Sequence, residues 1–327
     1  MDLDVVFLGT SASAPTARRG TSSLLIRRGG DRLLFDCGEG TQRQLLRSSV
    51  GLIDLEDIFI THFHADHYLG LPGMLKTFAL RMRELPLRIY GPPGLEALFD
   101  ALSIVFGRLP YPLHLEEIRA GEAIERDGYS VQVFPVTHRG PAVGYALVEE
   151  ERPGRFDVEV ATELGVPFGP ERGRLQRGES VTLADGTTVF PDQLVGPARP
   201  GRTVIYTGDA RNAEAVPVLF PGADLLIHES TFTQADRVRA RETQHSTAAE
   251  AAQTASDAGV ALLALTHISP RYPGSELLRE AREIFPATVL PRDFDTIDVP
   301  FAERGEPTLV KGGGRPEPFE VQVAPPA

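Results

Sequence analysis

The sequence is poor in cysteine and in long apolar runs. Cys37 is the one cysteine among 327 residues. A lone thiol cannot form an intramolecular disulfide, which excludes the class of proteins that disulfide bonds stabilise and favours a location in the reducing cytoplasm. The longest apolar runs, such as Val260–Leu265, fall far short of the ~20 residues of a transmembrane helix. Residues 1–4 lack the basic start and apolar stretch of a signal peptide, so we expect neither export by that route nor a membrane partner.

An excess of basic residues is also lacking. The chain has 33 Lys and Arg against 45 Asp and Glu, a formal net charge of −12. This balance argues against general adhesion to nucleic acid or anionic membranes, although a local basic patch is compatible with it. Apolar content of 42% and charged content of 24% are ordinary for globular proteins and exclude disordered and fibrous classes. The length allows two domains, or one larger α/β domain with an insertion.

Short apolar segments between glycine-rich loops occupy most of the chain. Strands are predicted at Val5–Leu8, Leu24–Ile26, Leu33–Phe35, Ile58–Ile60, Leu87–Tyr90, Val131–Phe134, Gly144–Val148, Thr203–Thr207, Leu225–Ile227 and Ala261–Leu265. Helices are predicted from Thr41, over Leu69–Leu80, over Leu95–Phe106 and over the alanine-rich Ala248–Ala258. Strands and helices mixed in both halves favour a layered α/β domain over a bundle or a barrel.

Two stretches differ in composition from this pattern. Residues 149–200 are rich in glycine, proline and charge and poor in long apolar runs, which indicates an insertion that leaves the core and returns. From Arg304 the composition again turns to glycine and proline, which predicts a loosely held tail over 304–327. We therefore expect one catalytic domain over residues 1–303 with an inserted arm.

Potential metal ligands gather directly after the apolar strand Ile58–Ile60. His62, His64, Asp66 and His67 lie within six residues. In an extended segment, His62, His64 and Asp66 share one face, and a turn at Asp66 brings His67 to the same centre. A solvated polar turn explains one or two such residues but is improbable for four. Imidazoles with a carboxylate suit Zn²⁺ in a catalytic site with an open position, although Mn²⁺ and Fe accept the same donors.

Three further candidate ligands follow predicted strands elsewhere in the chain. His138, Asp209 and His267 each come at or just beyond the end of such a strand. An open α/β layer assembles its sites from the carboxyl ends of several strands. Each residue alone is a weak signal, because a single His or Asp after a strand is more often a cap or a surface group. Together with the cluster they suffice for two metal ions with one carboxylate between them.

The pattern His62-x-His64-x-Asp66-His67, followed by His138, Asp209 and His267, resembles the metallo-β-lactamase superfamily. The resemblance implies a four-layered αββα sandwich with a dinuclear site along one edge of the sheets. His62, His64 and His138 would hold one metal ion. Asp66, His67 and His267 would hold the other, and Asp209 would bridge the two. This ligand pattern is almost silent on the substrate, because members of the superfamily hydrolyse lactams, thioesters, lactones and phosphodiesters.

Further segments resemble the ribonuclease Z family, whose members remove 3′ trailers from precursor tRNA. They are Phe7–Thr10 with Pro15-Thr16, Phe35–Gln42, His228–Thr231, His245–Glu250 and Thr266–Ser269, in chain order. Arg18-Arg19-Gly20 replaces the basic-Asn pair that is common in the family. The resemblance covers roughly residues 3 to 300 and is far more specific than the ligand set. It implies a zinc-dependent endoribonuclease with two zinc ions per subunit, acting in the cytoplasm as a homodimer.

Catalytic roles follow from the same resemblance. Asp66 is the candidate general base, and His245 is the candidate general acid for the leaving 3′ oxygen. Glu229 is the candidate that orients His245. Cys37 has no activating histidine pattern beside it, so we expect a small buried residue rather than a nucleophile.

Family members carry an arm in the interval of the insertion, and this arm grips tRNA away from the cleavage site. Here residues 165–178 hold Arg172, Arg174 and Arg177 against Glu171, a local charge of +2. Arginine suits phosphate contact, which makes these three the candidate RNA-binding residues. Two other readings remain open at this point: a related phosphodiesterase of small diesters or cyclic nucleotides, and a non-catalytic RNA-binding scaffold.

Overall fold

The computed structural model describes residues 1–52, 55–211 and 213–312. The chain divides into two compact units. The larger unit comprises residues 1–124, 131–147 and the described residues from Thr203 onward. The smaller unit comprises Glu125–Ser130 and Val148–Arg202, and it contains the predicted insertion.

The first sheet of the larger unit has eight strands in the order β17-β16-β1-β2-β3-β4-β5-β6. Its strands are β1 (Leu3–Gly9), β2 (Ser23–Arg28), β3 (Asp31–Phe35), β4 (Asp57–Phe59), β5 (Leu87–Gly91), β6 (Leu113–Glu117), β16 (Thr296–Asp298) and β17 (Thr308–Val310). Strands β3 to β6 run parallel, and the others pair antiparallel. Central β4 is buried over its whole length, as expected for a parallel strand that is covered on both faces.

The second sheet has seven strands in the order β15-β14-β13-β12-β9-β8-β7. Its strands are β7 (Ala123–Arg126), β8 (Tyr129–Pro135), β9 (Val143–Glu149), β12 (Thr203–Tyr206), β13 (Leu225–Glu229), β14 (Leu262–Thr266) and β15 (Thr288–Val289). Strands β12 to β15 are parallel, so their carboxyl ends meet at one edge of the sheet.

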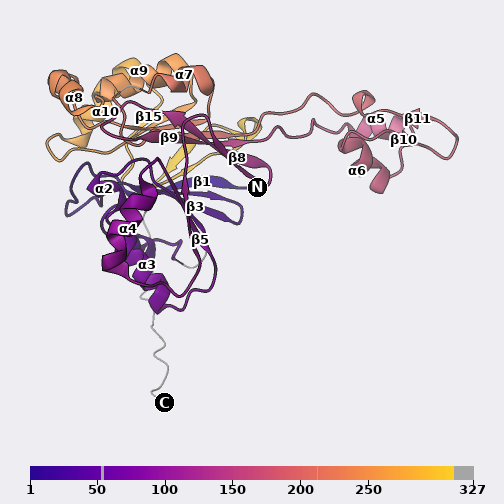
Figure 1. Cartoon of the computed structure of the whole chain (residues 1–327). Helices are drawn as coiled ribbons and strands as arrows, with labels where there is room; N and C mark the ends of the chain where they lie inside the picture. Colours follow the sequence, from indigo (N-terminus) through magenta and orange to yellow (C-terminus); the bar gives the residue numbers. More distant parts are fainter. Residues whose placement is uncertain (53–54, 212, 313–327) are drawn as a thin grey trace. The chain divides into compact units, whose positions relative to one another are not determined.

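Aromatic side chains fill the space between the two sheets. Phe35 and Phe59 of the first sheet stack with ring centroids 4.8 Å apart, and Phe59 meets Tyr145 of the second sheet edge-on at 5.5 Å. Helices cover the outer faces, with α3 (Leu71–Leu80) and α4 (Leu95–Phe106) over the first sheet and α9 (Ala248–Ala258) over β13 and β14. Figure 1 shows α7 (Ala215–Leu219), α9 and α10 (Gly274–Ile284) gathered on the outer side of the second sheet. The layers are therefore helix, sheet, sheet and helix, as predicted.

The helices of the larger unit occupy the connections between strands. They are α1 (Thr41–Arg47), α2 (Ala65–Tyr68), α3 (Leu71–Leu80), α4 (Leu95–Phe106), α7 (Ala215–Leu219), α8 (Arg237–Thr243), α9 (Ala248–Ala258) and α10 (Gly274–Ile284), with 3₁₀ turns η2 (Gln234–Asp236) and η3 (Ala302–Arg304). Helix α9 begins with a capping box, in which Thr247 Oγ1 accepts from Glu250 N at 3.1 Å and Glu250 Oε2 accepts from Thr247 N at 2.9 Å. The predicted boundaries of this helix are confirmed.

Two predictions about local structure need correction. The predicted helix Leu69–Leu80 begins two residues later, as α3 at Leu71, and the short helix α2, which was not predicted, precedes it. Gly70 lies between the two helices. A Cβ at Gly70 would lie 2.2 Å from the Gly38 carbonyl oxygen, so glycine is required for this close approach. Residues 308–310, predicted to lie in the tail, form β17 because they pair with β16 at the edge of the first sheet. Residues 313–327 of the predicted tail lie outside the described residues.

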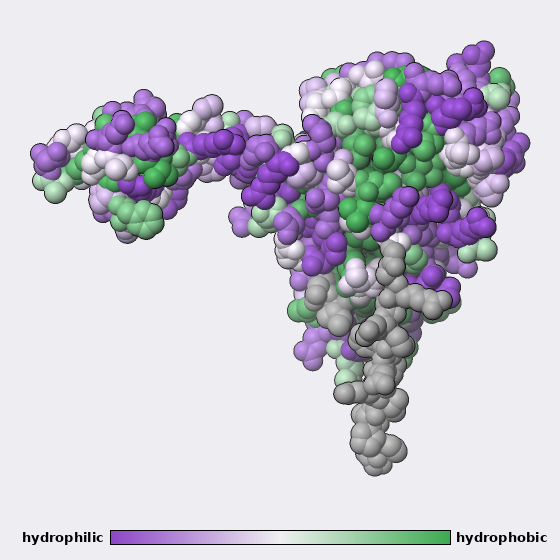
Figure 2. Space-filling model, turned by 180° about the vertical axis from the view of Figure 1, so that it is seen from behind, coloured by the Kyte–Doolittle hydropathy of each residue, from purple (hydrophilic) through white to green (hydrophobic). Residues whose placement is uncertain are grey.

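The smaller unit has a hydrophobic core of its own. It contains α5 (Val158–Glu163), α6 (Pro170–Gln176), the hairpin of β10 (Val181–Thr182) and β11 (Thr188–Val189), and the 3₁₀ turn η1 (Pro191–Gln193). Its buried residues are Ala161, Val166, Leu175, Val181, Val189 and Leu194. Hydrophilic residues cover most of its face that is visible at the left of Figure 2. These elements carry no clear signal in the sequence because they are short and their apolar residues are widely spaced.

No helix within the described residues combines the length and the apolar character that a membrane crossing requires.

Candidate metal centre

The histidine cluster begins where the apolar strand β4 ends. The Thr61 backbone N–H donates to Asp36 Oδ1 at 2.8 Å, which fixes the chain just before His62. His64 is extended, and the helical turn α2 begins at Ala65. The prediction that Asp66 shares an extended face with His62 and His64 is therefore wrong. The turn of α2 instead directs Asp66 and His67 toward a second group of side chains.

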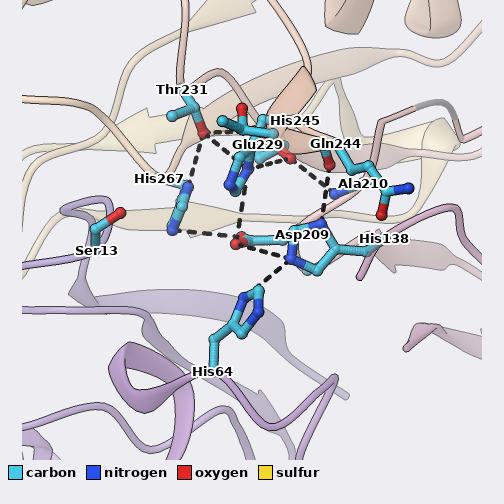
Figure 3. A network of polar contacts seen from close by, with 12 residues as sticks. Ser13, His64, His138, Asp209, Ala210, Glu229, Thr231, Gln244, His245 and His267 are labelled. Atoms are coloured by element: carbon cyan, nitrogen blue, oxygen red, sulfur yellow. Dashed lines mark hydrogen bonds and ion pairs between the residues drawn. The ribbon is translucent and has the colours of Figure 1, made fainter. Parts of the chain in front are cut away.

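The potential ligands form three groups, and within each group the donor atoms lie within 4.8 Å of one another. They are His62, His64, His138 and Asp209; Asp66, His67 and His267; and Asp209, His245 and His267. All seven residues predicted as metal ligands are thus brought together, from segments that are up to about two hundred positions apart in the chain. Figure 3 shows His64, His138, His245 and His267 arranged around Asp209.

The two oxygens of Asp209 face different groups. Asp209 Oδ2 lies 3.8 Å from His62 Nε2 and 3.9 Å from His138 Nε2. Asp209 Oδ1 lies 3.4 Å from both His67 Nε2 and His267 Nε2. This placement of one carboxylate between two sets of imidazoles is the geometry that a bridging ligand needs.

The cluster contains buried polar atoms that no protein group satisfies. Within the described residues, His62 Nε2, His67 Nε2 and Asp209 Oδ1 are buried without a hydrogen-bond partner. Leaving such atoms unpaired is costly, so native proteins rarely do so without a ligand or an ion. Imidazole nitrogens and carboxylate oxygens are the donors that zinc prefers. The residues present therefore fit the predicted metal.

Neighbouring groups orient three of the imidazoles. His67 Nδ1 lies 2.7 Å from Asp36 Oδ2, His267 Nδ1 lies 2.8 Å from Thr231 Oγ1, and His138 Nδ1 lies 2.9 Å from the Gln244 carbonyl oxygen. Each contact occupies Nδ1 and leaves Nε2 facing the cluster. Tyr206 adds a further contact, since its hydroxyl donates to Asp36 Oδ2 at 2.8 Å. No motif in the sequence marks Tyr206 as part of the site. Its position three residues before Asp209 is the one feature that connects it with the predicted ligands.

His245 and Glu229 form a buried pair beside Asp209. His245 Nδ1 lies 3.0 Å from Glu229 Oε1, and the same oxygen accepts from the Ala210 backbone N–H at 2.8 Å. Burial lowers the pKa of His245, but the charge of Glu229 and the hydrogen bond to it outweigh burial and raise this pKa to about 9. The two residues are 16 positions apart, and the structure places them in direct contact, as the resemblance implied for their roles.

Burial and nearby charges shift the pKa values of His62 and His67 in opposite directions. Burial lowers the pKa of His62 well below its usual value. Burial also lowers the pKa of His67, but the charges of Asp209 and Asp36 raise it well above the usual value. Burial raises the pKa of Asp66, but the hydrogen bond from His267 together with the charges of His67 and His267 outweighs burial and holds this pKa far below the usual value. Asp66 is therefore ionised across the physiological range.

The three arginines predicted to bind RNA lie in or next to α6 of the smaller unit. The Arg172 guanidinium donates to the Val166 carbonyl at 3.0 Å and to Thr162 Oγ1 at 3.1 Å. Arg174 Nε lies 2.9 Å from Glu179 Oε2, and Arg177 Nε lies 3.7 Å from Glu179 Oε1. Arg174 and Arg177 remain about half or more exposed. Arg172 thus forms hydrogen bonds within the smaller unit, whereas the guanidinium groups of Arg174 and Arg177 are accessible to solvent.

Comparison with known proteins identifies the family. Residues 16–246 match the metallo-beta-lactamase superfamily. A ribonuclease Z of Natronomonas pharaonis is 48% identical over 308 residues, which cover 93% of this chain and 100% of that protein. A ribonuclease Z of Myxococcus xanthus is 46% identical over 305 residues, which cover 92% of this chain and 99% of that protein.

Solved structures agree with this result. Human tRNase Z, short form, superimposes with a TM-score of 0.66 and 28% identity, covering 91% of this chain and 99% of that one. A metallo-beta-lactamase fold protein of Bacillus subtilis shares the fold with a TM-score of 0.67 at 19% identity, covering 91% of this chain and 100% of that one. With this fold, this cluster and near-full-length identity close to one half, the chain belongs to the ribonuclease Z family of the metallo-β-lactamase superfamily.

Proposed function

We propose that this chain is a zinc-dependent endoribonuclease that removes the 3′ trailer from precursor tRNA and leaves a 3′-hydroxyl on the tRNA. The observation that carries the proposal is the convergence of six donor side chains on two sides of Asp209, in a chain of the ribonuclease Z family. In this assignment His62, His64 and His138 would hold one zinc ion, and Asp66, His67 and His267 would hold the second. Asp209 would serve both sites.

The metal ions and the side chains have separate tasks in this proposal. When bound, the cations supply Lewis-acid stabilisation of phosphate charge and acidify water in the site. Asp66, which is ionised, accepts the proton of the attacking water. His245 is protonated at neutral pH because its pKa is about 9, so it can donate a proton to the leaving 3′ oxygen. Glu229 holds that imidazole in place and keeps it protonated.

Substrate binding is assigned to a second region. We assign the smaller unit to tRNA contact outside the cleavage site, with Arg174 and Arg177 as the exposed phosphate-binding groups. Arg172 was predicted to share this role, and its bonds to Val166 and Thr162 support an additional task in ordering the unit. We also propose a homodimer in the cytoplasm, where the buried Cys37 stays reduced. Light scattering on the purified chain tests the dimer.

The central experiment is cleavage of a precursor tRNA with and without a chelator, with the cut position mapped to the nucleotide. The proposal expects a metal-dependent cut at the tRNA–trailer junction that yields a 3′-hydroxyl and a 5′-phosphorylated trailer. Zinc analysis of the protein should give two ions per chain. An intact precursor, or a cut that persists at full strength after the metal is removed, contradicts the proposal.

A further inference from the structure

The loop between β1 and β2 brings a backbone amide to the metal centre. Ser13 has a φ of +58°, in the left-handed region that side-chain-bearing residues seldom adopt. In this conformation the Ser13 N–H donates to Asp66 Oδ2 at 2.8 Å. The Ser13 side chain is exposed, so the backbone is the part of this residue that meets the site. Figure 3 shows Ser13 beside His267 at the edge of the cluster.

The carboxylate of Asp293 accepts hydrogen bonds from this loop at positions away from Ser13. Asp293 Oδ2 accepts from the Gly20 backbone N–H at 2.6 Å and from Gln44 Nε2 at 2.8 Å. Asp293 Oδ1 accepts from Thr10 Oγ1 at 2.7 Å. Thr10 and Gly20 are the two ends of the loop that carries Ser13, so a single side chain fastens both ends.

Arg19 completes the attachment. Its Nη1 donates to Thr10 Oγ1 at 2.5 Å and to the Pro291 carbonyl oxygen at 2.9 Å. Through these two bonds the guanidinium of Arg19 links the loop to the segment before β16.

The segment that presents Asp293 is itself held in an unfavourable conformation. Phe294 has a φ of +72°, which is rare for a bulky residue. Asp295 accepts from the Arg292 N–H and the Gly312 N–H, both at 2.9 Å, and the Phe294 N–H donates to the Phe7 carbonyl at 2.6 Å. Strained residues persist where surrounding bonds over-determine them, and they concentrate at functional sites.

We propose that Asp293 is a positioning residue for catalysis: it holds the loop 10–20 so that the Ser13 amide fixes the carboxylate of Asp66. This inference rests on the proposed role of Asp66 as ligand and proton acceptor. Asp66 Oδ2 lies 3.2 Å from His267 Nε2 and 3.6 Å from His67 Nε2, so it faces two imidazoles at once. A carboxylate in that position can rotate about its last bond. The Ser13 N–H holds one orientation, and outer contacts of this kind are worth about 10–100-fold in metal affinity or activity.

The first test replaces Asp293 by asparagine, which keeps the shape of the side chain but removes one of its two acceptors. Gly20 N–H, Gln44 Nε2 and Thr10 Oγ1 then compete for one oxygen. We expect Asp293→Asn to lower kcat on precursor tRNA by about 10–100-fold with KM within about twofold. We also expect one of the two zinc ions to pass to a competing chelator at about tenfold lower chelator concentration. The matched control is Asp298→Asn, at an exposed carboxylate on β16.

A second pair of variants acts on the amide itself and leaves Asp293 in place. Glycine keeps the Ser13 N–H and adopts a positive φ readily, whereas β-branched valine strongly disfavours it. Ser13→Val should therefore lose at least about tenfold more kcat than Ser13→Gly, with the same difference in zinc release. This pair keeps the test decisive if Asp293→Asn lowers the melting temperature.

The outcomes separate this inference from the proposed function. If Asp293→Asn and Ser13→Val both keep the kcat and the zinc affinity of the wild-type protein, the inference is wrong. It is also wrong if these variants change KM alone. If the wild-type protein leaves precursor tRNA intact, the proposed function fails, but the zinc-release comparison still decides whether Asp293 and Ser13 position Asp66.

Discussion

The metal centre and the smaller unit use charged residues in opposite ways. At the centre, charged and polar groups are buried and face one another, and several buried atoms have no protein partner within the described residues. In the smaller unit, Arg174 and Arg177 each pair with Glu179, and all three side chains are about half or more exposed. Burial makes the electrostatics of the centre strong and specific, whereas solvent screens the exposed charges. The centre is therefore suited to chemistry, and the smaller unit is suited to weak, additive contact with a polyanion.

The largest expected effect comes from removing the carboxylate that both ligand groups share. Asp209→Ala leaves His62, His67, His138 and His267 without the oxygen between them. We expect zinc content to fall and precursor cleavage to drop by more than the ~100-fold that outer contacts cost. Metal analysis and single-turnover cleavage measure both. Asp257→Ala, at an exposed carboxylate of α9, is the control. Full zinc content in Asp209→Ala would contradict the proposed role of Asp209 and, with it, the difference between the two regions.

A smaller loss is expected from His245→Ala. Removing a general acid lowers kcat by about 10²–10⁴-fold. The two zinc ions should remain bound, because His245 pairs with Glu229 and is not among the seven assigned ligands. The control is His114→Ala, an exposed histidine of β6. Loss of zinc in His245→Ala would reassign this residue as a ligand.

Replacing the smaller unit tests the other side of the comparison. Residues 155–196 can be exchanged for a short glycine-serine linker while the paired backbones of Arg152 and Arg199 stay in place. We expect kcat/KM for precursor tRNA to fall at least about tenfold because phosphate contacts are lost. Hydrolysis of a small chromogenic phosphodiester should be unchanged, since the metal centre lies within the larger unit. Equal losses on both substrates would contradict a separate binding role.

Within the smaller unit, the arginines should differ from one another. The double variant Arg174→Ala/Arg177→Ala should raise KM a few-fold and reduce the slope of log KM against log salt by about 1–2. Its thermal stability should barely change, because exposed ion pairs contribute little. Arg172→Ala should instead lower the stability of the unit to proteolysis, because it removes the bonds to Val166 and Thr162. Identical behaviour of both variants would remove the distinction.

The smallest effect is expected at Cys37. Burial raises the pKa of its thiol far above the usual value, so the reactive thiolate is scarce at neutral pH and stays scarce as the pH rises to 9. A thiol reagent should react slowly with the native protein across this range and rapidly after unfolding. Cys37→Ser should retain cleavage. Fast labelling of the native protein would show that the region beneath the metal centre opens to solvent.

Prediction from sequence succeeded where short patterns define both a local structure and a chemistry. The apolar segment 58–60 predicted a buried strand, and the predicted ligands that follow it lie close to those from the other strand ends. It failed where long-range pairing decides the conformation. Residues 308–310 lie in a stretch whose overall composition is typical of a tail, yet they complete a sheet edge because β16 offers them unpaired backbone groups. Tyr206 and Asp293 carry no motif, and only the folded chain shows what they contact.

The sequence by itself determined the layered α/β class, the donor types at the centre and the family, because apolar periodicity and ligand spacing are local properties of the chain. Only the tertiary structure decided that Asp209 divides its oxygens between two groups, that Arg172 serves its own unit, and that Asp293 reaches the loop of Ser13. These contacts join residues through side-chain directions set by sheet packing. Such directions depend on the whole fold and leave no pattern among neighbouring positions.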